Sequence, residues 1–145
     1  MRTEGPDGYW VSDDPALLDL DRVQQWISGE SYWAKGRPRE VMVSAIGNSL
    51  NLGLYGPDGT QAGFARLVTD YATFAWLCDV FVDSAHRGHG LGSFLIWQAV
   101  DHPAVRDCRQ FLATSHDRTV YERFGYATLS DARRWMDRPA RGTAG

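Results

Sequence analysis

The sequence of 145 residues is poor in lysine and cysteine and contains no long apolar run. Lys35 is the only lysine, so nearly all of the positive charge comes from arginine. The 15 lysine and arginine residues against 18 acidic residues give a net charge of −3, whereas proteins that bind nucleic acids present a basic surface. The charge therefore argues against a nucleic-acid partner.

Two cysteines, Cys78 and Cys108, are too few to build a disulfide framework or a zinc site. Among the four histidines, His86 and His89 have no cysteine or carboxylate at the usual zinc spacing. We therefore predict two reduced thiols and no metal ion.

No stretch approaches the roughly 18 apolar residues that a membrane-spanning helix needs, and the first ten residues lack the apolar centre of a signal peptide. We predict a cytoplasmic protein that does not enter a membrane. Apolar residues make up 43% of the chain, with six Trp, six Tyr and six Phe, which is enough for one core. We predict a loose segment over 1–8, a single domain over 9–137 and a flexible tail over 138–145.

The apolar pattern and the turn residues predict alternating strands and helices. Strands are expected over 9–12, 50–55, 61–69, 73–83 and 109–115, with a last one from 125–126 that continues or resumes near 134–136. Helices are expected from 15 to Gly29, from Pro38 to Gly47, over 93–102 and over 117–124. The order β-α-α-β-β-β-α-β-α-β predicts an α/β fold of the mixed α+β type, a mixed sheet with helices on both faces.

A glycine-rich loop, RGHGLG, lies between the third long strand and the following helix. Glycines allow backbone N–H groups to approach a ligand closely, and the helix start adds further N–H groups and a positive dipole. This arrangement suits a pyrophosphate. The loop lacks the Gly-Lys-Ser/Thr of a P-loop and has Ser93 where a dinucleotide fingerprint needs glycine. The alternative is a tight turn that merely uses glycine.

With these residues in view, the chain resembles the GNAT superfamily of N-acetyltransferases, and in particular small single-domain bacterial members. The resemblance runs from Leu77 to Gly125 and includes DVFVDSAHRGHGLGSFL, similar to the acetyl-CoA signature, and VYERFGY, similar to the segment with the family's tyrosine. Because the two motifs occur in the order found in the family, together they indicate the family more specifically than either motif alone.

The resemblance implies an acetyl-CoA site. Main-chain groups of Val80 and Val82 match positions that pair with the pantetheine arm, and Tyr121 matches the tyrosine that hydrogen-bonds and protonates the leaving sulfur. An amphipathic core tyrosine is the alternative for Tyr121. The residues that match the pyrophosphate site are Arg87, Gly88, His89, Gly90, Gly92 and Ser93.

The chain also departs from the family pattern. Family members often carry Asn at the start of the helix with the tyrosine, where this chain has His116-Asp117, and some carry a catalytic Glu on the strand matching 109–115, where this chain has none. Asp79 interrupts an apolar strand and is a candidate base for the acceptor amine. Pairing with an arginine is the alternative role for Asp79, and a chain of water molecules is the alternative base.

The loop before the second helix contains Tyr32, Trp33, Lys35 and Arg37, in a region that often forms the acceptor wall in this family. Tyr32, Trp33 and Arg37 are therefore candidate substrate residues, able to hold a flat or carboxylate-bearing molecule. Packing of Trp33 into the core and a surface ion pair of Arg37 are the alternative.

Together these features predict an acetyl-CoA-dependent N-acetyltransferase that acts on a primary amine of a small molecule or peptide by direct attack. One alternative is a non-catalytic CoA-sensing or partner-binding module on the same fold, and another is a nucleotide-binding domain of a different fold. The resemblance is also compatible with a homodimer.

Overall fold

A computed structural model of the chain describes residues 1–116 and 118–142, which form a six-stranded mixed sheet in the order β1-β2-β3-β4-β5-β6. The strands are β1 (Arg2–Glu4), β2 (Trp10–Ser12), β3 (Leu50–Tyr55), β4 (Gln61–Thr69), β5 (Phe74–Val82) and β6 (Arg109–Phe111). The α-helices are α1 (Leu20–Gln24), α2 (Arg39–Gly47), α3 (Leu91–Val100) and α4 (Thr119–Glu122). Neighbouring strands are antiparallel except for β5 and β6, which are parallel and are connected through α3.

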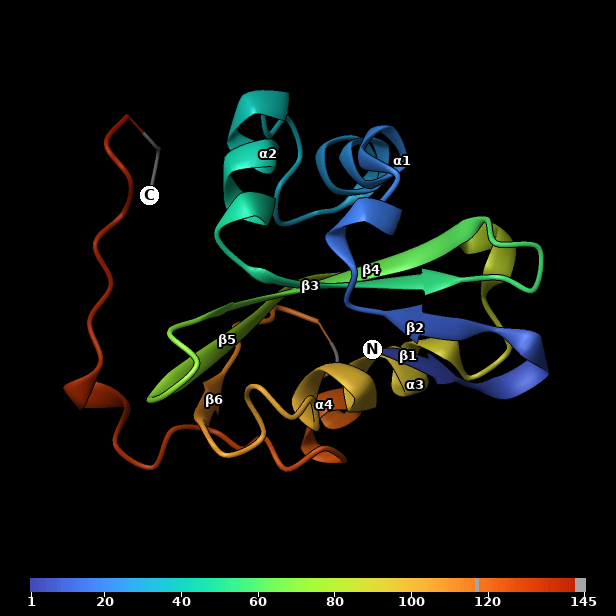
Figure 1. Cartoon of the computed structure of the whole chain (residues 1–145). Helices are drawn as coiled ribbons and strands as arrows, with labels where there is room; N and C mark the ends of the chain where they lie inside the picture. Colours follow the sequence, from blue (N-terminus) through green and yellow to red (C-terminus); the bar gives the residue numbers. More distant parts are fainter. Residues whose placement is uncertain (117, 143–145) are drawn as a thin grey trace.

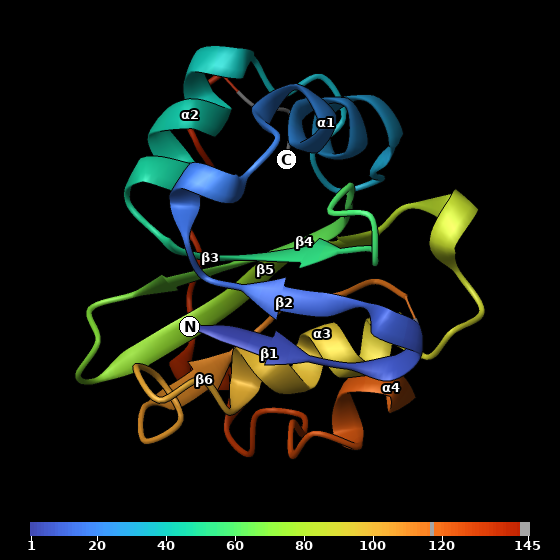
Figure 2. The ribbon, with the colours of Figure 1, turned by 45° about the vertical axis from the view of Figure 1, so that its right-hand side comes forward.

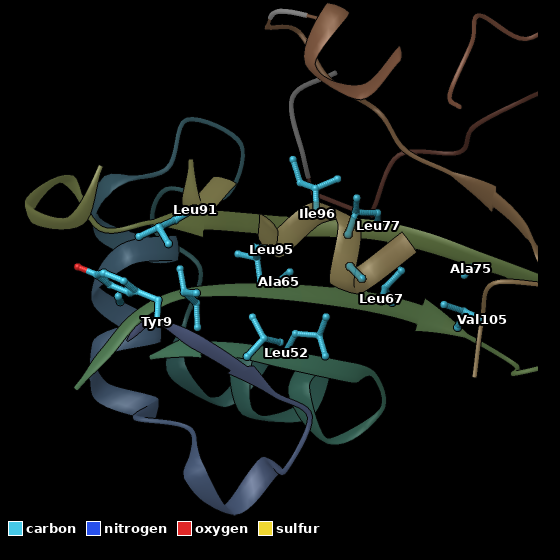
Figure 3. Close-up of a cluster of buried hydrophobic side chains, with 14 residues drawn as sticks. Tyr9, Leu52, Ala65, Leu67, Ala75, Leu77, Leu91, Leu95, Ile96 and Val105 are labelled. Atoms are coloured by element: carbon cyan, nitrogen blue, oxygen red, sulfur yellow. The ribbon is translucent and has the colours of Figure 1, made fainter. Parts of the chain in front are cut away.

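The helices cover both faces of the sheet, α1 and α2 on one face and α3 and α4 on the other (Figures 1 and 2). The larger core lies between the sheet and α3, where apolar side chains of the strands meet those of the helix (Figure 3). Its labelled members are Tyr9, Leu52, Ala65, Leu67, Ala75, Leu77, Leu91, Leu95, Ile96 and Val105. A second core under α1 and α2 includes Val23, Trp26, Ile27, Met42, Ile46, Phe64 and Phe81.

The predicted fold class, a mixed sheet with helices on both faces, is confirmed. The hairpin of β3 and β4 has the predicted bounds, because the turn residue Asp58 accepts hydrogen bonds from the backbone and side chain of Thr60. Helix α2 begins directly after Pro38 and ends at Gly47, also as predicted.

The prediction of a loose segment over residues 1–8 is wrong. Residues Arg2–Glu4 form β1, which pairs with β2 at the edge of the sheet, and Pro6–Gly8 form a short 3₁₀ turn between these two strands. The glycines and the proline that suggested disorder instead make this turn, in which Gly8 has a φ of 79°.

The predicted continuous first helix is divided into three pieces: a 3₁₀ turn Pro15–Leu17, the helix α1 and a π-helical segment Gln25–Glu30. Two aspartates cause the first division. The Asp14 side chain accepts from the N–H of Ala16, and the Asp19 side chain accepts from the N–H of Arg22, so each begins a new helical segment.

No strand follows α4 in residues 118–142, so the prediction of a last strand at 125–126 and 134–136 is wrong. The chain leaves α4 through Gly125, whose φ is 94°, and then runs past the β6 edge of the sheet toward the side that α2 covers (Figures 1 and 2). Residues 134–136 include the end of a 3₁₀ turn, Ala132–Arg134. Of the predicted tail, 138–142 are exposed, and 143–145 lie outside the described residues.

Candidate functional site

Strand β5 carries a β-bulge at Asp79 that changes which residues face each side of the sheet. Between the pairs Phe64↔Phe81 and Arg66↔Cys78, β5 advances one residue more than β4. The extra residue allows Asp79 to adopt a φ of 53°, a left-handed conformation that aspartate tolerates better than most residues. Asp79 thereby turns its carboxylate toward the side of α1 and α2, where its partners lie.

Strands β5 and β6 pair over only three positions, the last of which is Trp76↔Phe111. Beyond it the two strands separate, so that the remainder of β5 has no strand neighbour on this edge within residues 1–116 and 118–142. Val80 and Val82, the predicted pantetheine-binding positions, lie on this part of β5 and are half-buried. An unpaired strand edge exposes backbone donors and acceptors to an extended ligand.

The glycine loop follows β5 and ends at the N-terminus of α3. Gly88 and Gly90 have φ values of 97° and 70°, so other residues at these positions would be strained. Within the described part of the chain, none of the backbone N–H groups of residues 87–90 donates to a protein acceptor. The first N–H of α3 that does so belongs to Phe94, which bonds to Gly90 O at 3.2 Å. The loop and first helical turn thus present a run of free donors.

Space around the loop is open. A Cβ atom built on Gly88, Gly90 or Gly92 would meet no protein atom within 4 Å. Gly92 has no positive φ, and an alanine there would fit this protein without strain. The absence of a side chain at Gly92 therefore leaves room above the helix start that no protein group uses.

Two side chains of the loop are held by other parts of the protein. The Nε of Arg87 donates to the carbonyl of Val82 at 3.1 Å, and its guanidinium carbon lies 5.7 Å from the centre of the Phe81 ring. The Nδ1 of His89 lies 3.2 Å from Oδ2 of Asp7, in the turn between β1 and β2. The turn between β1 and β2, part of the segment 1–8 that was predicted to be loose, thus contacts the glycine loop.

At the bulge, Asp79 is at the centre of a buried polar cluster. Its side chain is 1% exposed. Oδ1 accepts from Trp33 Nε1 at 2.8 Å, while Oδ2 accepts from Arg37 Nη1 at 2.7 Å and from Arg66 Nε at 2.9 Å. One carboxylate therefore joins the loop before α2 to strands β4 and β5.

The environment of Asp79 makes it a weak base. Burial alone raises the pKa of this carboxyl, but the hydrogen bond from Arg37, the charge of Arg66 and the hydrogen bond from Trp33 outweigh burial and hold the pKa below its usual value. Both oxygens are also occupied. Of its two predicted roles, general base or arginine partner, the geometry favours the arginine partner.

The loop that carries Trp33 and Arg37 is fastened by hydrogen bonds to the preceding helical segment. Ser31 Oγ donates to the carbonyl of Ile27 at 2.6 Å, and Gly36 N donates to the carbonyl of Ser28 at 2.8 Å. Gln24 Nε2 donates to the carbonyl of Arg37 at 2.8 Å. These bonds fix the positions from which Trp33 and Arg37 reach Asp79.

Tyr32 extends from the same loop to the segment after β6. Its hydroxyl lies 3.4 Å from Thr114 Oγ1 and accepts from the backbone N–H of Ser115 at 3.4 Å, and its ring centre lies 3.9 Å from that of His116. The hydrogen bonds from this segment lower the pKa of Tyr32. Tyr32 thus connects the loop before α2 with the segment leading to α4. Asp117, part of the predicted helix start, lies outside the described residues.

Tyr121 is half-buried on α4, and no hydrogen bond to its hydroxyl is found in residues 1–116 and 118–142. Burial raises the pKa of Tyr121, and the nearby Tyr32 raises it further. The Tyr121 side chain therefore stays protonated at neutral pH, and its hydroxyl has no partner in the part of the chain that the structure describes. Tyr32 and Tyr121, which the sequence separates by 89 positions, interact electrostatically.

A cleft of about 690 Å³ lies between β6, α4 and the segment that follows α4. Tyr121, Leu112 and Thr114 line it, but no residue of the glycine loop does. Tyr126 crosses this region, where its hydroxyl donates to Gln110 Oε1 at 3.3 Å. The cleft borders β6 and also residues 125–126, part of the predicted last strand.

The sequence interpretation missed Arg66, although an arginine in the apolar run GFARL was a visible signal. Cys78 lies close enough to this cluster for its charges to act on the thiol, and burial raises the pKa of Cys78 to about 11, so the thiol is neutral.

Among the described residues no group of three or more His, Cys, Asp or Glu could hold a metal ion. None of the described helices is long and apolar enough to cross a membrane.

Comparison with known proteins agrees with the resemblance to the GNAT acetyltransferases. The family model of the GNAT acetyltransferases matches residues 20–126. The crystal structure of a Xanthomonas campestris protein, described as a candidate acetyltransferase of the GNAT family, is similar with a TM-score of 0.89 and 37% identity. That similarity covers 95% of this chain and 97% of the other.

Two further relatives are more distant. A Gibberella zeae protein described as a candidate acetyltransferase is 32% identical over 106 residues, which cover 61% of this chain and only 60% of that relative. A Mycobacterium tuberculosis protein, solved in complex with CoA, is similar with a TM-score of 0.67 and 17% identity, over 83% of this chain and 72% of that one. At this identity the likeness shows the fold alone.

Proposed function

The chain belongs to the GNAT family of acetyltransferases, and on that premise we propose that it transfers the acetyl group of acetyl-CoA to a primary amine of a small molecule or peptide. The observation that carries this proposal is the run of N–H groups from Arg87 to Ser93 that have no protein acceptor among the described residues, next to the edge of β5 that no described strand covers. The amine attacks the thioester directly, without a covalent enzyme intermediate.

The residues present fit acetyl-CoA. Free N–H groups at a helix N-terminus bind phosphate oxygens, and the open space above Gly88, Gly90 and Gly92 lets a pyrophosphate reach them. The backbone of Val80 and Val82 offers the edge along which an extended amide chain pairs. Arg87, His89 and Ser93 complete the proposed phosphate site, with Arg87 turning from the Val82 carbonyl to the phosphates.

When bound, acetyl-CoA supplies an activated thioester whose leaving group is a thiolate. We assign stabilisation of that sulfur to the hydroxyl of Tyr121. A simple thiol has a pKa of about 8.5, already below that of an ordinary tyrosine, and burial raises the pKa of Tyr121 further, so complete proton transfer from Tyr121 to the thiolate is unfavourable. A hydrogen bond from Tyr121 to the developing thiolate avoids this cost, and solvent completes the protonation.

The acceptor amine must lose a proton before attack, which costs roughly 4–5 kcal/mol for an alkylamine at pH 7. The low pKa and occupied oxygens of Asp79 make it unsuitable as the base. Tyr32 and Trp33 are 48% and 41% exposed, so the acceptor side is open to water. We therefore propose that the proton leaves through water molecules, and that Asp79 organises the acceptor side.

Replacing Gly92 with alanine separates cofactor binding from folding. We expect Gly92→Ala to leave the free energy of unfolding unchanged or raise it by up to about 1 kcal/mol, because alanine favours helix and the added Cβ meets no protein atom. The same Cβ occupies the approach of the pyrophosphate, so the Kd for acetyl-CoA is expected to rise at least about 10-fold. Calorimetric titration and denaturant unfolding measure the two effects.

Gly47→Ala is the matched control, because Gly47 also lies in a helix and an added Cβ there also meets open space. Its Kd for acetyl-CoA is expected to equal that of the wild type. Unchanged cofactor affinity in Gly92→Ala would contradict the proposed phosphate site.

Thiol release from acetyl-CoA in the presence of a panel of primary amines tests the catalytic part of the proposal. We expect CoA to form in proportion to the acetylated amine, and mass spectrometry of the protein to detect no acetyl-enzyme. Tight binding of acetyl-CoA without transfer to any amine would instead favour a CoA-sensing module.

A further inference from the structure

The buried cluster at the β5 bulge contains more positive than negative charge. Arg37 and Arg66 both pair with Asp79, at 2.7 and 2.9 Å, and within residues 1–116 and 118–142 neither arginine forms an ion pair with a second carboxylate. Their side chains are only 22% and 11% exposed. Two guanidinium groups and one carboxylate leave an excess charge of one, in a place where water screens it poorly.

The two arginines also have unused hydrogen-bond donors. Arg37 uses Nη1 toward Asp79 and toward the sulfur of Met42, and Arg66 uses Nε toward Asp79 and Nη1 toward Ser49 Oγ. A guanidinium has five N–H donors, so both side chains retain donors without a protein acceptor in the described residues. Asp79 holds both groups in place, so a bound anion would meet donors that are already oriented.

Aromatic surfaces adjoin these donors. The Nε1 of Trp33 is fixed by Asp79, and the rings of Trp33 and Tyr32 lie edge to face with centres 5.0 Å apart. Tyr32 in turn contacts the segment after β6. Contacting residues therefore lead from the excess positive charge, past two exposed rings, to the segment that precedes α4, the helix of Tyr121.

We infer that the acceptor is a primary amine that also carries a carboxylate, and that Arg37, with Arg66 behind it, binds the carboxylate while Trp33 and Tyr32 flank the connecting part. This inference rests on the proposed function and deepens it. A guanidinium matches a carboxylate in geometry as well as charge. Arg37 is the specificity-determining residue, since it is the more exposed of the two arginines.

Matched acceptors test the inference. Three pairs that differ only in carboxylate against carboxamide are assayed for thiol release: 4-(aminomethyl)benzoate, 3-(aminomethyl)benzoate and 4-aminobutanoate, each with its amide. The wild type is expected to prefer the carboxylate at least about 10-fold in kcat/KM for one pair or more, chiefly through KM. Equal kcat/KM within all three pairs, or a preference for the amides, would overturn the inference while leaving acetyl transfer in place.

Arg37→Gln is expected to reduce this preference to less than about 3-fold, because kcat/KM falls more for the carboxylate than for the amide. The variant still contains Arg66 and Trp33 as partners of Asp79, so the buried carboxylate remains paired while the excess positive charge is removed. Arg39→Gln is the control, because Arg39 is an exposed arginine of α2 that pairs with Asp21, and it is expected to retain the wild-type preference. An equal loss for carboxylate and amide in Arg37→Gln would indicate a structural role only.

Binding of the corresponding products separates this inference from the proposed function. 4-(Acetamidomethyl)benzoate and its amide are titrated calorimetrically into the protein with CoA present, for the wild type and Arg37→Gln. Selective binding of the carboxylate by the wild type alone supports the anion site even if no amine is acetylated. Binding of both compounds with equal affinity would refute it even if amines are acetylated.

Discussion

Replacement of Tyr121 with phenylalanine is expected to lower kcat for acetyl transfer about 10²-fold, the range for loss of a hydrogen-bond donor to a developing charge. The Tyr121 hydroxyl has no partner among the described residues, so its removal leaves no buried group unpaired and the fold is expected to persist. The KM and Kd for acetyl-CoA are expected to stay within about 2-fold, since the phosphate contacts are elsewhere. Steady-state kinetics and calorimetric titration measure these quantities.

Tyr126→Phe is the control for Tyr121→Phe, because Tyr126 packs against Tyr121 with ring centres 6.3 Å apart but uses its hydroxyl toward Gln110. It is expected to change kcat less than about 3-fold. Since the raised pKa of Tyr121 keeps its hydroxyl protonated, kcat of the wild type is expected to show no decline from tyrosine ionisation between about pH 6 and 9. An equal loss of turnover and cofactor affinity in Tyr121→Phe would contradict the assigned role.

Replacement of Asp79 with asparagine is expected to lower the free energy of unfolding by about 3–5 kcal/mol, because it leaves Arg37 and Arg66 close together without the carboxylate that pairs with both. Asparagine preserves the side-chain shape and tolerates the left-handed backbone at this position. The expected loss of stability therefore results from the missing charge and not from backbone strain. Urea unfolding monitored by circular dichroism at pH 7 measures it.

Asp21→Asn is the matched control, since Asp21 also pairs with an arginine, Arg39, at 2.6 Å, but its side chain is 87% exposed. Its removal is expected to cost at most about 1 kcal/mol. Equal costs for the two variants would show that burial of the Asp79 cluster contributes nothing.

The loss of stability caused by Asp79→Asn is expected to become smaller as the pH falls. Asp79 has a lower pKa in the folded than in the unfolded protein, so its stabilisation is complete above about pH 4 and is lost as the pH falls through the folded pKa. The stability difference between the wild type and Asp79→Asn is therefore expected to narrow below about pH 4. A difference that stays constant to low pH would contradict the charged state assigned to Asp79.

Local signals predicted much of the fold. The turn around Asp58 and the flanking apolar runs placed β3 and β4 at their observed bounds, and Pro38 and Gly47 bounded α2. The errors lie where local signals compete with tertiary contacts. Glycine and proline in residues 1–8 suggested disorder, yet pairing with β2 orders this segment as β1. The apolar pattern suggested one first helix, yet caps at Asp14 and Asp19 divide it.

The candidate site also has a part that the sequence indicated and a part that only the structure shows. Trp33, Arg37 and Asp79 were each recognised in the sequence with two alternative roles, and nothing in the linear order indicated that they touch. Arg66 was not recognised at all. The structure joins them because the bulge in β5 turns Asp79 toward the fastened loop before α2. The proposed acceptor specificity follows only from this contact.

The sequence by itself indicated the family, through the resemblance of two motifs. It also determined the mixed-sheet fold and the glycine loop, because these depend on neighbouring residues: turn chemistry, apolar periodicity and glycines that precede a helix start. The tertiary structure alone decided the edge strand β1, the missing last strand and the charged cluster at Asp79. The partners of Asp79 are 13 to 46 positions away in the chain. Contacts over such separations form only when the whole core has closed, and no local propensity encodes them.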